Sequence, residues 1–474
     1  MTQVIGTRIF SQIDIDWFAA ASGDHNPLHV DPEIARRLIA GGTVTHGVYA
    51  FLWALEEYFK TGGQPLDALN ARFRRTISAG EEIRLTRRDA PKSISISLES
   101  AVEEVASIVL SGNLITEANS AEMRRGRPSR GQPSMRTFGE LGGLSGEVPI
   151  TADPSDLRRE FPSVVAALGE LPTAAIMALS PVVGMKAPGL HSIFTGIDIA
   201  LAGDNASGSL QWRVSRVISP IAPIKLEVEG GGLRGHLDAV IRPAPVSQPG
   251  MREVEAAVSR DEFVGHRAII VGGSRGLGEL VAKLVAAGGG VSAITYFKGE
   301  ADAKRVAFEI EARGGSCKTL PLDVGNSNSV ETAIKSDAST SATHLYYFAT
   351  PLIAKLGTDV FDVAAFNRYS DTYVGAFVNF TTQLHRSAAR PLHVLYPSST
   401  YVAEPPKGFA EYVAAKGAGE AACNYLSRTR ADLDIVVHRL PRLETDQTAS
   451  LIPKHLGSSL VEMTSVVRAM HARL

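Results

Sequence analysis

The segment RAIIVGGSRGLGELVAKLVAAG, residues 267–288, constrains the fold of this chain more than any other. A continuous apolar run leads into Gly272, Gly276 and Gly278, and an apolar helical pattern follows at once. A strand, a glycine-rich turn and a helix in this order form the phosphate-binding start of a doubly wound sheet. Further runs, HLYYFAT, HVLYPSS and DIVVHRL, alternate with helical segments. We therefore expect an α/β Rossmann domain with a parallel sheet over residues 261–474.

The N-terminal half shows a different pattern, in which one helical stretch is followed by several strands. Residues 46–58 are typical of an apolar helix, and the alternating segment SISISLES that follows is typical of a sheet with one face in water. A second helical stretch at about 155–178 precedes GSLQWRVSRVI and PIKLEVEG. We therefore expect two similar α+β units, residues 1–117 and 147–242, placed side by side.

Two segments rich in Pro, Gly and polar residues separate these blocks. The first, residues 118–146, contains RRGRPSRGQPSMR, and its arginines are either solvated or available to a phosphate. The second, residues 243–260, begins with RPAPVSQPG at Arg242, and its prolines argue against helix or inner strand. A chain of 474 residues should hold about three domains at roughly 150 residues each. Three blocks agree with that number.

The composition excludes several classes of protein. A hydrophobic fraction of 44% and a charged fraction of 21% exclude disorder over most of the chain. Forty-eight basic and 50 acidic side chains give a net charge of −2, without the basic excess that a nucleic-acid partner would need. No secretory signal and no long apolar run is present, so we expect no membrane span and a cytoplasmic location. Cys317 and Cys423 are expected to be reduced and buried.

The densest polar cluster of the N-terminal block is ASGDHNPLHVDP, residues 21–32. Asp24 and His29 lie on a segment that a glycine and a proline keep out of a regular helix. A carboxylate and an imidazole on one loop can hold a water molecule and exchange protons with a substrate. Asn26 offers both a donor and an acceptor for orienting the pair. From composition alone, an ordinary turn with Asx hydrogen bonds is an equally open interpretation.

The string FAAASGDHNPLHVDPEIAR, followed by GGTVTHGVYA, resembles the signature of MaoC-like (R)-specific enoyl-thioester hydratases, which have the hot-dog fold. The resemblance is close over the first 60 residues or so, and implies that Asp24 and His29 are an acid/base dyad. It also implies that His46 and Gly47 open the central helix, where the Gly47 N–H could stabilise an enolate-like thioester oxygen. The middle block has no second such loop and resembles the noncatalytic half of a double hot-dog. Its His191 is expected to be a partnerless core or interface residue.

A second group of chemically active residues lies near the C-terminus. Tyr412 and Lys416 are four residues apart in EYVAAKGAGEAA, which is typical of a helix, so both side chains face the same side. An ammonium close to a phenol lowers the phenol's pKa and allows it to donate a proton near neutrality. Ser399, at the end of HVLYPSS, could hydrogen-bond the same substrate oxygen. A surface helix contact is the simpler interpretation of the pair alone, but the serine and the glycine turn favour an active site.

With the GGSRGLG turn, these residues resemble the short-chain dehydrogenase/reductase family, in particular its 3-oxoacyl-thioester reductases. The resemblance covers nearly all of 263–450, and implies catalytic roles for Ser399, Tyr412 and Lys416 and a nicotinamide cofactor. The segment ITYFKGE has no acidic residue for a ribose 2′-hydroxyl, whereas Arg275 and Lys298 could meet a 2′-phosphate, which favours NADPH over NADH. The residues expected to bind the cofactor are Gly272, Ser274, Arg275, Gly276, Leu277, Gly278, Lys298, Asp323, Val324, Ala349, Tyr412 and Lys416.

The chain departs from the family pattern at three places. Tyr347-Phe348-Ala349-Thr350 stands where the family carries Asn-Asn-Ala-Gly, and Thr372 replaces a catalytic asparagine. Pro-Arg replaces the Pro-Gly that follows the sixth strand. A lost asparagine could slow a proton relay, and Tyr347 and Phe348 could crowd the cofactor. These departures predict a divergent or weakened reductase.

The two chemistries are consecutive steps. We expect a bifunctional enzyme that reduces a 3-oxoacyl thioester of CoA or carrier protein with NADPH and reversibly dehydrates the (R)-3-hydroxyacyl product. Fusion would raise the effective concentration of the intermediate, in fatty-acid or polyketide-type metabolism. One alternative is a hydratase whose Rossmann domain only senses a cofactor, and another is a noncatalytic partner in a synthase complex. No metal is expected, and a homodimer is one possible assembly.

Overall fold

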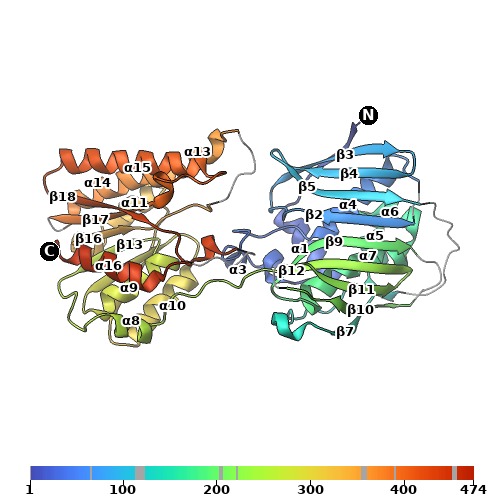
Figure 1. Cartoon of the computed structure of the whole chain (residues 1–474), viewed down its shortest axis with the longest axis horizontal. Coiled ribbons are helices and arrows are strands. Elements are labelled where there is room, and N and C mark those ends of the chain that lie inside the picture. The colour runs from blue at the N-terminus through green and yellow to red at the C-terminus, as the bar shows by residue number, and fades with distance from the viewer. Residues whose placement is uncertain are drawn as a thin grey trace. The chain divides into compact units, whose positions relative to one another are not determined.

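The computed structural model describes residues 2–64, 67–112, 123–201, 207–219, 222–353, 360–388, 391–450 and 456–474. The chain forms two compact units, of which the first comprises Met1–Ala244 and Ser450–Pro453 and the second Pro245–Ala449 and Lys454–Leu474 (Figure 1). The expected boundary at residue 117 and the start of the expected linker, 118–122, lie outside the described residues. Each unit is considered by itself below.

The first unit is built on an antiparallel sheet in which ten strands are described, in the order β1-β3-β4-β5-β2-β9-β12-β11-β10-β7. Read from its outer edge to the centre of the sheet, the half that begins with β7 has the same arrangement of strands as the half that begins with β1. The sheet therefore consists of two similar halves. Pairing of β2 with β9, from Ala68 opposite Ala200 to Arg72 opposite Gly196, joins the halves into one sheet. The strands are β1 Thr2–Ile9, β2 Ala68–Phe73, β3 Glu82–Ala90, β4 Ser93–Glu99, β5 Glu104–Ser111, β7 Ser145–Pro149, β9 Ser192–Leu201, β10 Ser209–Arg216, β11 Ile224–Gly230 and β12 Leu233–Ile241.

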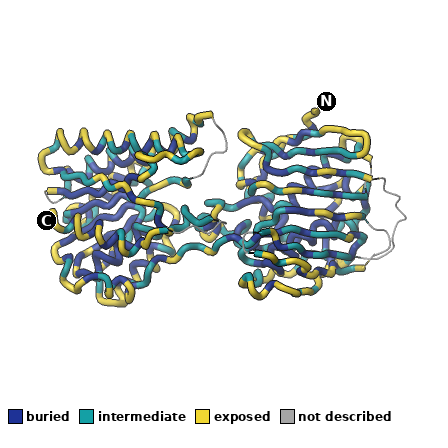
Figure 2. The backbone as a smooth tube through the Cα atoms, viewed as in Figure 1, coloured by how far each residue is buried: buried dark blue, intermediate teal, exposed yellow. Residues whose placement is uncertain are grey.

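The helices of the first unit cover one face of this sheet (Figure 1). Strands such as β11 alternate buried and half-buried residues, as a sheet with a single covered face requires (Figure 2). No single described helix is long and apolar enough to cross a membrane, and one bent pair, α6 with α7 and η2, passes by length and composition only. The helices are α1 Gln12–Ser22, α2 Pro27–Val30, α3 Pro32–Ala35, α4 Gly47–Lys60, α5 Pro154–Glu160, α6 Pro162–Leu168, α7 Glu170–Pro181 and the π-helical turn η2 Val182–Lys186.

Polar contacts also connect the two halves of the first unit. The Glu56 carboxylate on α4 is buried and accepts the N–H groups of Ser163 at 2.9 Å and Val164 at 3.0 Å, which open α6. A carboxylate at a helix N-terminus satisfies otherwise unpaired N–H groups. The Tyr49 hydroxyl donates to Glu160 at 2.7 Å. The predicted α+β double hot-dog is therefore confirmed, and its halves are held together by strand pairing and side-chain hydrogen bonds.

The expected linker between the halves is partly ordered. Arg124–Arg125 forms strand β6, which pairs in parallel with β8, Thr151–Ala152. The Arg127 guanidinium pairs with Asp156 at 2.9 Å, and the short helix η1 covers Phe138–Glu140. Arg127 thus pairs with an acidic residue far along the chain, while its side chain stays 54% exposed.

The second unit is built on a parallel sheet in which six strands are described, in the order β15-β14-β13-β16-β17-β18. Helices cover both faces, and the strand order reverses between β13 and β16, where ligands bind in such sheets. The predicted doubly wound fold is confirmed. The strands are β13 Arg267–Val271, β14 Val291–Tyr296, β15 Ser316–Pro321, β16 His344–Tyr347, β17 Leu392–Ser399 and β18 Leu433–Leu440. The helices are α8 Met251–Ala257, α9 Gly276–Ala287, α10 Glu300–Glu311, α11 Ser327–Ile334, α12 Asp337–Thr340, α13 Val363–Ser370, η3 Asp371–Ala376, α14 Phe377–Ser387, η4 Thr400–Val402, α15 Ala410–Thr429, η5 Asp446–Thr448 and α16 Ser459–His471.

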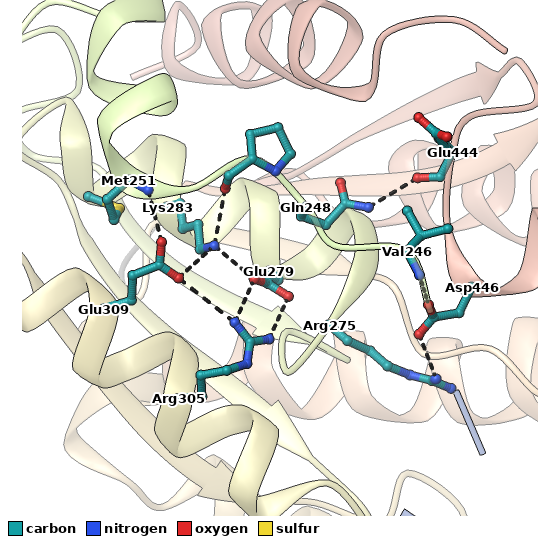
Figure 3. Close-up of polar contacts among 11 residues, drawn as sticks. Val246, Gln248, Met251, Arg275, Glu279, Lys283, Arg305, Glu309, Glu444 and Asp446 are labelled. Carbon is teal, nitrogen blue, oxygen red and sulfur yellow. Dashed lines mark hydrogen bonds and ion pairs between the residues drawn. The ribbon is translucent and has the colours of Figure 1, made fainter. Parts of the chain in front are cut away.

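A buried ion network fixes helix α9, which follows the glycine turn (Figure 3). Lys283 is almost fully buried, and its ammonium lies 2.8 Å from both Glu279 and Glu309. It also donates to the Pro249 carbonyl at 3.1 Å, and Arg305 pairs with Glu279 at 3.0 Å. Because each buried charge has a partner of opposite sign, the desolvation of the group is offset. The network connects α9 to α10 and to the segment before α8. Helix α8, Met251–Ala257, lies within the expected linker 243–260.

Histidine side chains cluster in the second unit, near the end of the sheet opposite the glycine turn. The rings of His266 and His344 stack with centroids 3.6 Å apart, and His471 on α16 places its Nδ1 3.4 Å from Nδ1 of His266. The His344 Nε2–H donates to the Met470 carbonyl at 3.1 Å. Burial, with smaller effects from neighbouring histidines, lowers the pKa of His266 to about 2 and that of His344 to about 4. Both imidazoles are therefore neutral at pH 7.

Cys317 and Cys423 are buried and free, as predicted.

The neutral histidines predict an acid-sensitive second unit. Below about pH 6.5, the pKa of histidine in the unfolded chain, His266 and His344 bind protons in the unfolded state but remain unprotonated in the folded state. The free energy of unfolding should then fall by about 1.4 kcal/mol per pH unit for each histidine between about pH 6 and pH 4. Urea unfolding followed by far-UV circular dichroism at pH 7, 6 and 5 measures this.

Tryptophan fluorescence separates the two units in this experiment. All three tryptophans, Trp17, Trp53 and Trp212, lie in the first unit, so tryptophan fluorescence reports that unit alone. His344→Gln should roughly halve the pH slope of the second unit. A circular-dichroism midpoint that does not move between pH 7 and pH 5 would contradict the prediction.

Candidate active sites

Helix capping positions the loop that carries the first candidate site. Helix α1 ends at Gly23, whose φ of 81° is the left-handed conformation that favours glycine. Asp24 follows directly, and the Asn26 side chain caps α2 by accepting the Leu28 N–H at 3.1 Å. Asp24 and Asn26 are 2% and 1% exposed. Two helix ends therefore hold these side chains in the interior.

His29 has a defined tautomer. Its Nδ1 lies 2.7 Å from the Val44 carbonyl, which can only accept, so Nδ1 carries the hydrogen and Nε2 has an unshared pair. The His46 ring stacks on it with centroids 3.7 Å apart, and His46 Nε2–H donates to the Asp24 carbonyl at 3.0 Å. Burial lowers the pKa of both imidazoles. Asp24, His29 and His46 place ligand atoms within 4.8 Å of one another, close enough to hold a metal ion as well as to transfer protons.

The Asp24 carboxylate is completed by the second half of the first unit. The Ser180 hydroxyl donates to it at 2.7 Å, and its own loop supplies the Asn26 N–H at 3.2 Å. A Cβ at Gly184 would lie 2.4 Å from both carboxylate oxygens, so only glycine fits there. The Asn26 amide donates to the Gly184 carbonyl at 2.9 Å and the Gly189 carbonyl at 3.2 Å. Burial raises the pKa of Asp24, while His29 and the hydrogen bonds oppose that rise.

Helix α4 begins beside this pair. Gly47 is its first residue and His46 its cap, as the resemblance implied, so the Gly47 N–H has no partner within the helix. The Thr45 hydroxyl and His46 Nδ1 are buried without a hydrogen-bond partner among the described residues. Buried polar atoms without partners are uncommon except where a ligand or water completes them. The loop and the helix start can therefore exchange protons with a bound molecule and stabilise an oxyanion on it.

Ser180 and Gly184 are site residues that sequence reasoning missed. They are four residues apart in ALSPVVGMKAPG, where a hydroxyl and a glycine interrupt an apolar helical stretch. That interruption is a signal, but only the fold brings it to Asp24. His191, expected to be a core or interface residue without an acidic partner, is half-buried, and its Nδ1 lies 3.4 Å from the Arg242 guanidinium.

The glycine turn of the second unit forms a cradle for a phosphate. Gly272 and Gly276 have φ values of 79° and 61°, and a Cβ at Gly278 would lie 2.4 Å from the Gly272 carbonyl oxygen. Glycine is therefore favoured at all three positions, and the N–H groups at the start of α9 have no partners within the helix. Ser274 and Leu277 belong to the same turn. The geometry fits the pyrophosphate of a dinucleotide.

The other expected cofactor residues follow the strands at the same edge of the sheet. Lys298 follows β14 and is exposed, Asp323 and Val324 follow β15, and Ala349 follows β16. The Asp323 carboxylate accepts the Gly325 N–H at 3.0 Å, which fixes its orientation. The structure thus brings these residues to the carboxyl edge of the sheet, where ligands bind in doubly wound folds.

Arg275 is engaged in an ion pair in this structure (Figure 3). It caps α9, and its guanidinium lies 3.1 Å from the Asp446 carboxylate. Asp446 also accepts the Val246 N–H at 2.7 Å. The guanidinium expected to meet a 2′-phosphate therefore already has a carboxylate partner that an incoming phosphate would have to share or displace.

Ser399, Tyr412 and Lys416 converge as expected, but their electrostatics differ from the expectation. Ser399 ends β17 and hydrogen-bonds the Tyr412 phenol, and the Lys416 ammonium donates to the Pro397 carbonyl at 2.7 Å. Burial raises the pKa of Tyr412 to about 12 and lowers that of Lys416 to about 7. The expectation that the lysine lowers the phenol's pKa is therefore wrong for this structure, because desolvation outweighs the other effects. The Lys416 ammonium lies 3.8 Å from the ring centroid of Tyr373, a residue that sequence reasoning missed.

The residues that depart from the family pattern take structural roles. Tyr347 is buried in the core, packs against Phe377 with centroids 5.2 Å apart, and donates to the Thr372 carbonyl at 3.0 Å. It therefore does not crowd the cofactor crevice, and that expectation is wrong for Tyr347. The Thr372 hydroxyl points back to its own helix, at 3.4 Å from the Arg368 carbonyl. Tyr373 makes a 2.5 Å hydrogen bond with Thr350, at the edge of the crevice.

Comparisons with known proteins agree with this division. A family model described as MaoC like domain matches residues 3–95, and one described as short chain dehydrogenase matches residues 266–446. No curated protein matches the chain. Similar solved structures include a short chain dehydrogenase from Burkholderia cenocepacia in complex with NADP, with 21% identity over 44% of this chain and 91% of that chain and a TM-score of 0.41. A short-chain dehydrogenase/reductase from Serratia marcescens has 19% identity over 44% of this chain and 91% of that chain, with a TM-score of 0.40. The FolM alternative dihydrofolate reductase 1 from Brucella suis in complex with NADP has 18% identity over 37% of this chain and 72% of that chain, with a TM-score of 0.33.

The contact between Gly184 and Asp24 predicts the effect of one added methyl group. Gly184→Ala should displace the carboxylate and lower kcat/KM for hydration of a 2-enoyl thioester about 100-fold or more, because misplacement by about 1 Å has that effect. Gly142→Ala is the matched control, since a Cβ there meets no atom within 4 Å. Circular dichroism checks folding of both variants. If Gly184→Ala hydrates the substrate at the wild-type rate, the assignment of Asp24 to the active site is wrong.

Proposed function

We propose that this chain, which joins a MaoC-like domain to a short-chain dehydrogenase domain, is a bifunctional acyl-thioester enzyme. Its second unit would reduce a 3-oxoacyl thioester with NADPH, and its first unit would reversibly dehydrate the (R)-3-hydroxyacyl thioester to the 2-enoyl thioester. The observation that carries the proposal is the Asp24/His29 pair: Asp24 is buried and accepts from Ser180, and half-buried His29 is oriented by the Val44 carbonyl. The acyl group would be carried by CoA or a carrier protein, in fatty-acid or polyketide-type metabolism of the cytoplasm.

The first unit would act by paired proton transfer. For hydration, a water molecule between Asp24 and His29 would lose a proton to the pair as its oxygen adds to C3 of the enoyl group. A proton would then be delivered to C2, so no net proton is gained or lost. The negative charge that develops on the thioester oxygen would be stabilised by the Gly47 N–H at the start of α4. His29 supports this role because it is neutral and Nε2 is unprotonated.

The second half of the first unit is proposed to be noncatalytic. Residues 147–242 contribute Ser180 and Gly184 to the Asp24 environment, and would otherwise form a wall of the acyl pocket. Its own central helix α7 starts after Gly169, without a His-Gly pair. One half would therefore supply the acid and base, and the other would hold the acid in place.

In the second unit, Tyr412 would donate a proton to the 3-oxo group while Ser399 holds the same oxygen. A nicotinamide cofactor, when bound, supplies the hydride. Lys416, whose pKa is lowered to about 7 by burial, would regain full charge next to the anionic cofactor and then lower the phenol's pKa. The glycine turn and the residues Lys298, Asp323, Val324 and Ala349 would bind the dinucleotide.

A second candidate is a hydratase whose Rossmann unit binds the cofactor but turns over slowly. It is favoured by Thr372, whose hydroxyl is bonded to its own helix, and by Lys416, which lies against Tyr373 and the Pro397 carbonyl. Cofactor binding without oxidation of NADPH by any 3-oxoacyl thioester would select this function.

Two variants separate the two activities. Asp24→Asn should lower hydration at least about 100-fold and leave NADPH oxidation unchanged. Tyr412→Phe should lower NADPH oxidation and leave hydration unchanged. Loss of nicotinamide absorbance with a 3-oxoacyl thioester measures reduction, and loss of enoyl absorbance measures hydration. If wild-type protein shows neither reaction with CoA and carrier-protein thioesters of several lengths, the proposed function is wrong.

The choice of NADPH over NADH depends on Arg275. Arg275→Ala should raise KM for NADPH about 10-fold or more and leave KM for NADH within about 2-fold, because it removes a charge-assisted hydrogen bond to the 2′-phosphate. Asp446→Asn keeps the acceptor for the Val246 N–H but removes the competing charge, so it should lower KM for NADPH. Equal effects of Arg275→Ala on both cofactors would contradict the assignment.

A further inference from the structure

A buried arginine of the first unit has no carboxylate partner among the residues that the structure describes. Arg242 follows β12 and is 2% exposed. Its Nη2 donates to the Leu190 carbonyl at 2.7 Å, and its Nη1 lies 3.4 Å from Nδ1 of His191. The Nε–H is buried without a hydrogen-bond partner among the described residues. No described carboxylate forms an ion pair with this guanidinium.

Such an arginine is unusual because a buried charge normally has a partner of opposite sign. Burial lowers the pKa of Arg242 only to about 10, so the side chain stays charged at neutral pH. The chain instead gives it neutral acceptors, a carbonyl and an imidazole. An oxyanion that approaches Nε would satisfy the remaining donor and compensate the charge in one step.

Arg242 lies beside the proton-transfer pair. The Leu190 carbonyl that accepts from Arg242 also accepts from the Asn26 amide at 3.3 Å, so both side chains hold the same oxygen. The Arg242 charge also contributes to the lowered pKa of His29. An anion at Arg242 would therefore belong to the molecule that reacts at Asp24 and His29.

We propose that Arg242 binds a carboxylate on the acyl group of the substrate, so that the first unit acts on dicarboxylyl thioesters. This inference rests on the proposed hydratase function. The phosphates of CoA or of a carrier protein are excluded as the ligand, because a long pantetheine arm separates them from the thioester and they stay near the surface. Arg242 is buried and shares the Leu190 carbonyl with Asn26 of the proton-transfer loop, so a group carried by the acyl chain is the anion that could reach it.

The test compares two substrates of equal chain length, glutaconyl-CoA and pent-2-enoyl-CoA, which differ in a terminal carboxylate against a methyl group. Wild-type protein should hydrate glutaconyl-CoA with the higher kcat/KM. Arg242→Met should lower kcat/KM for glutaconyl-CoA about 100-fold and leave that for pent-2-enoyl-CoA within a few fold. Arg242→Lys, which keeps a charge, should retain part of the preference.

Arg234→Met is the matched control, because Arg234 lies on β12, the strand that Arg242 follows, but is exposed and pairs with Glu229 at 2.7 Å. It should change neither rate. Arg242→Met removes an unpaired buried charge, so its unfolding midpoint should not fall, and reductase activity of the same preparation checks the second unit.

The outcomes separate the two proposals. If the wild-type protein hydrates neither substrate, the proposed function fails. If it hydrates both equally well, or if Arg242→Met lowers both rates by the same factor, the hydratase function stands and the carboxylate subsite is wrong. Equal loss on both substrates would instead assign Arg242 to the thioester oxygen or to positioning of Asn26.

Discussion

The arrangement of the first unit depends on a carboxylate that has been removed from water. Asp24 is held in the interior by a helix end, and a buried carboxylate needs hydrogen-bond donors and close packing. Its own half supplies one backbone N–H, while the Ser180 hydroxyl and the bare backbone at Gly184 come from the other half. The pairing of β2 with β9 and the capping of α6 by Glu56 keep those groups in register. The second half is therefore part of the site.

In the second unit, the corresponding constraint is the start of α9. The first N–H groups of α9 have no partners within the helix, and they can bind a phosphate only if the helix itself is held in place. The buried network of Glu279, Lys283, Arg305 and Glu309 fixes that helix to α10 and to the segment before α8. The most rigid charges of this unit thus lie one turn away from the residues expected to bind the cofactor.

Local chemistry could be predicted from the sequence, and long-range electrostatics could not. The loop with Asp24 and His29, the glycine turn and the Tyr412/Lys416 pair are each encoded within a few residues, so their positions were predictable. The Ser180 contact joins residues 156 positions apart, and the Arg275–Asp446 pair joins residues 171 apart. The pKa of Tyr412 depends on burial by the whole fold, so reasoning from its neighbour Lys416 gave the wrong direction. The contact between His191 and Arg242 likewise joins residues 51 positions apart.

The continuous sheet has a consequence for how this pocket can change. Where two identical subunits build a pocket by dimerising, every substitution appears on both sides, so a group that helps at one wall also alters the other. Here β2 and β9 join two unlike halves of one polypeptide. A serine, a glycine or a buried arginine can then be placed on one wall alone. Covalent linkage has broken the symmetry of the pocket, and each wall is free to specialise.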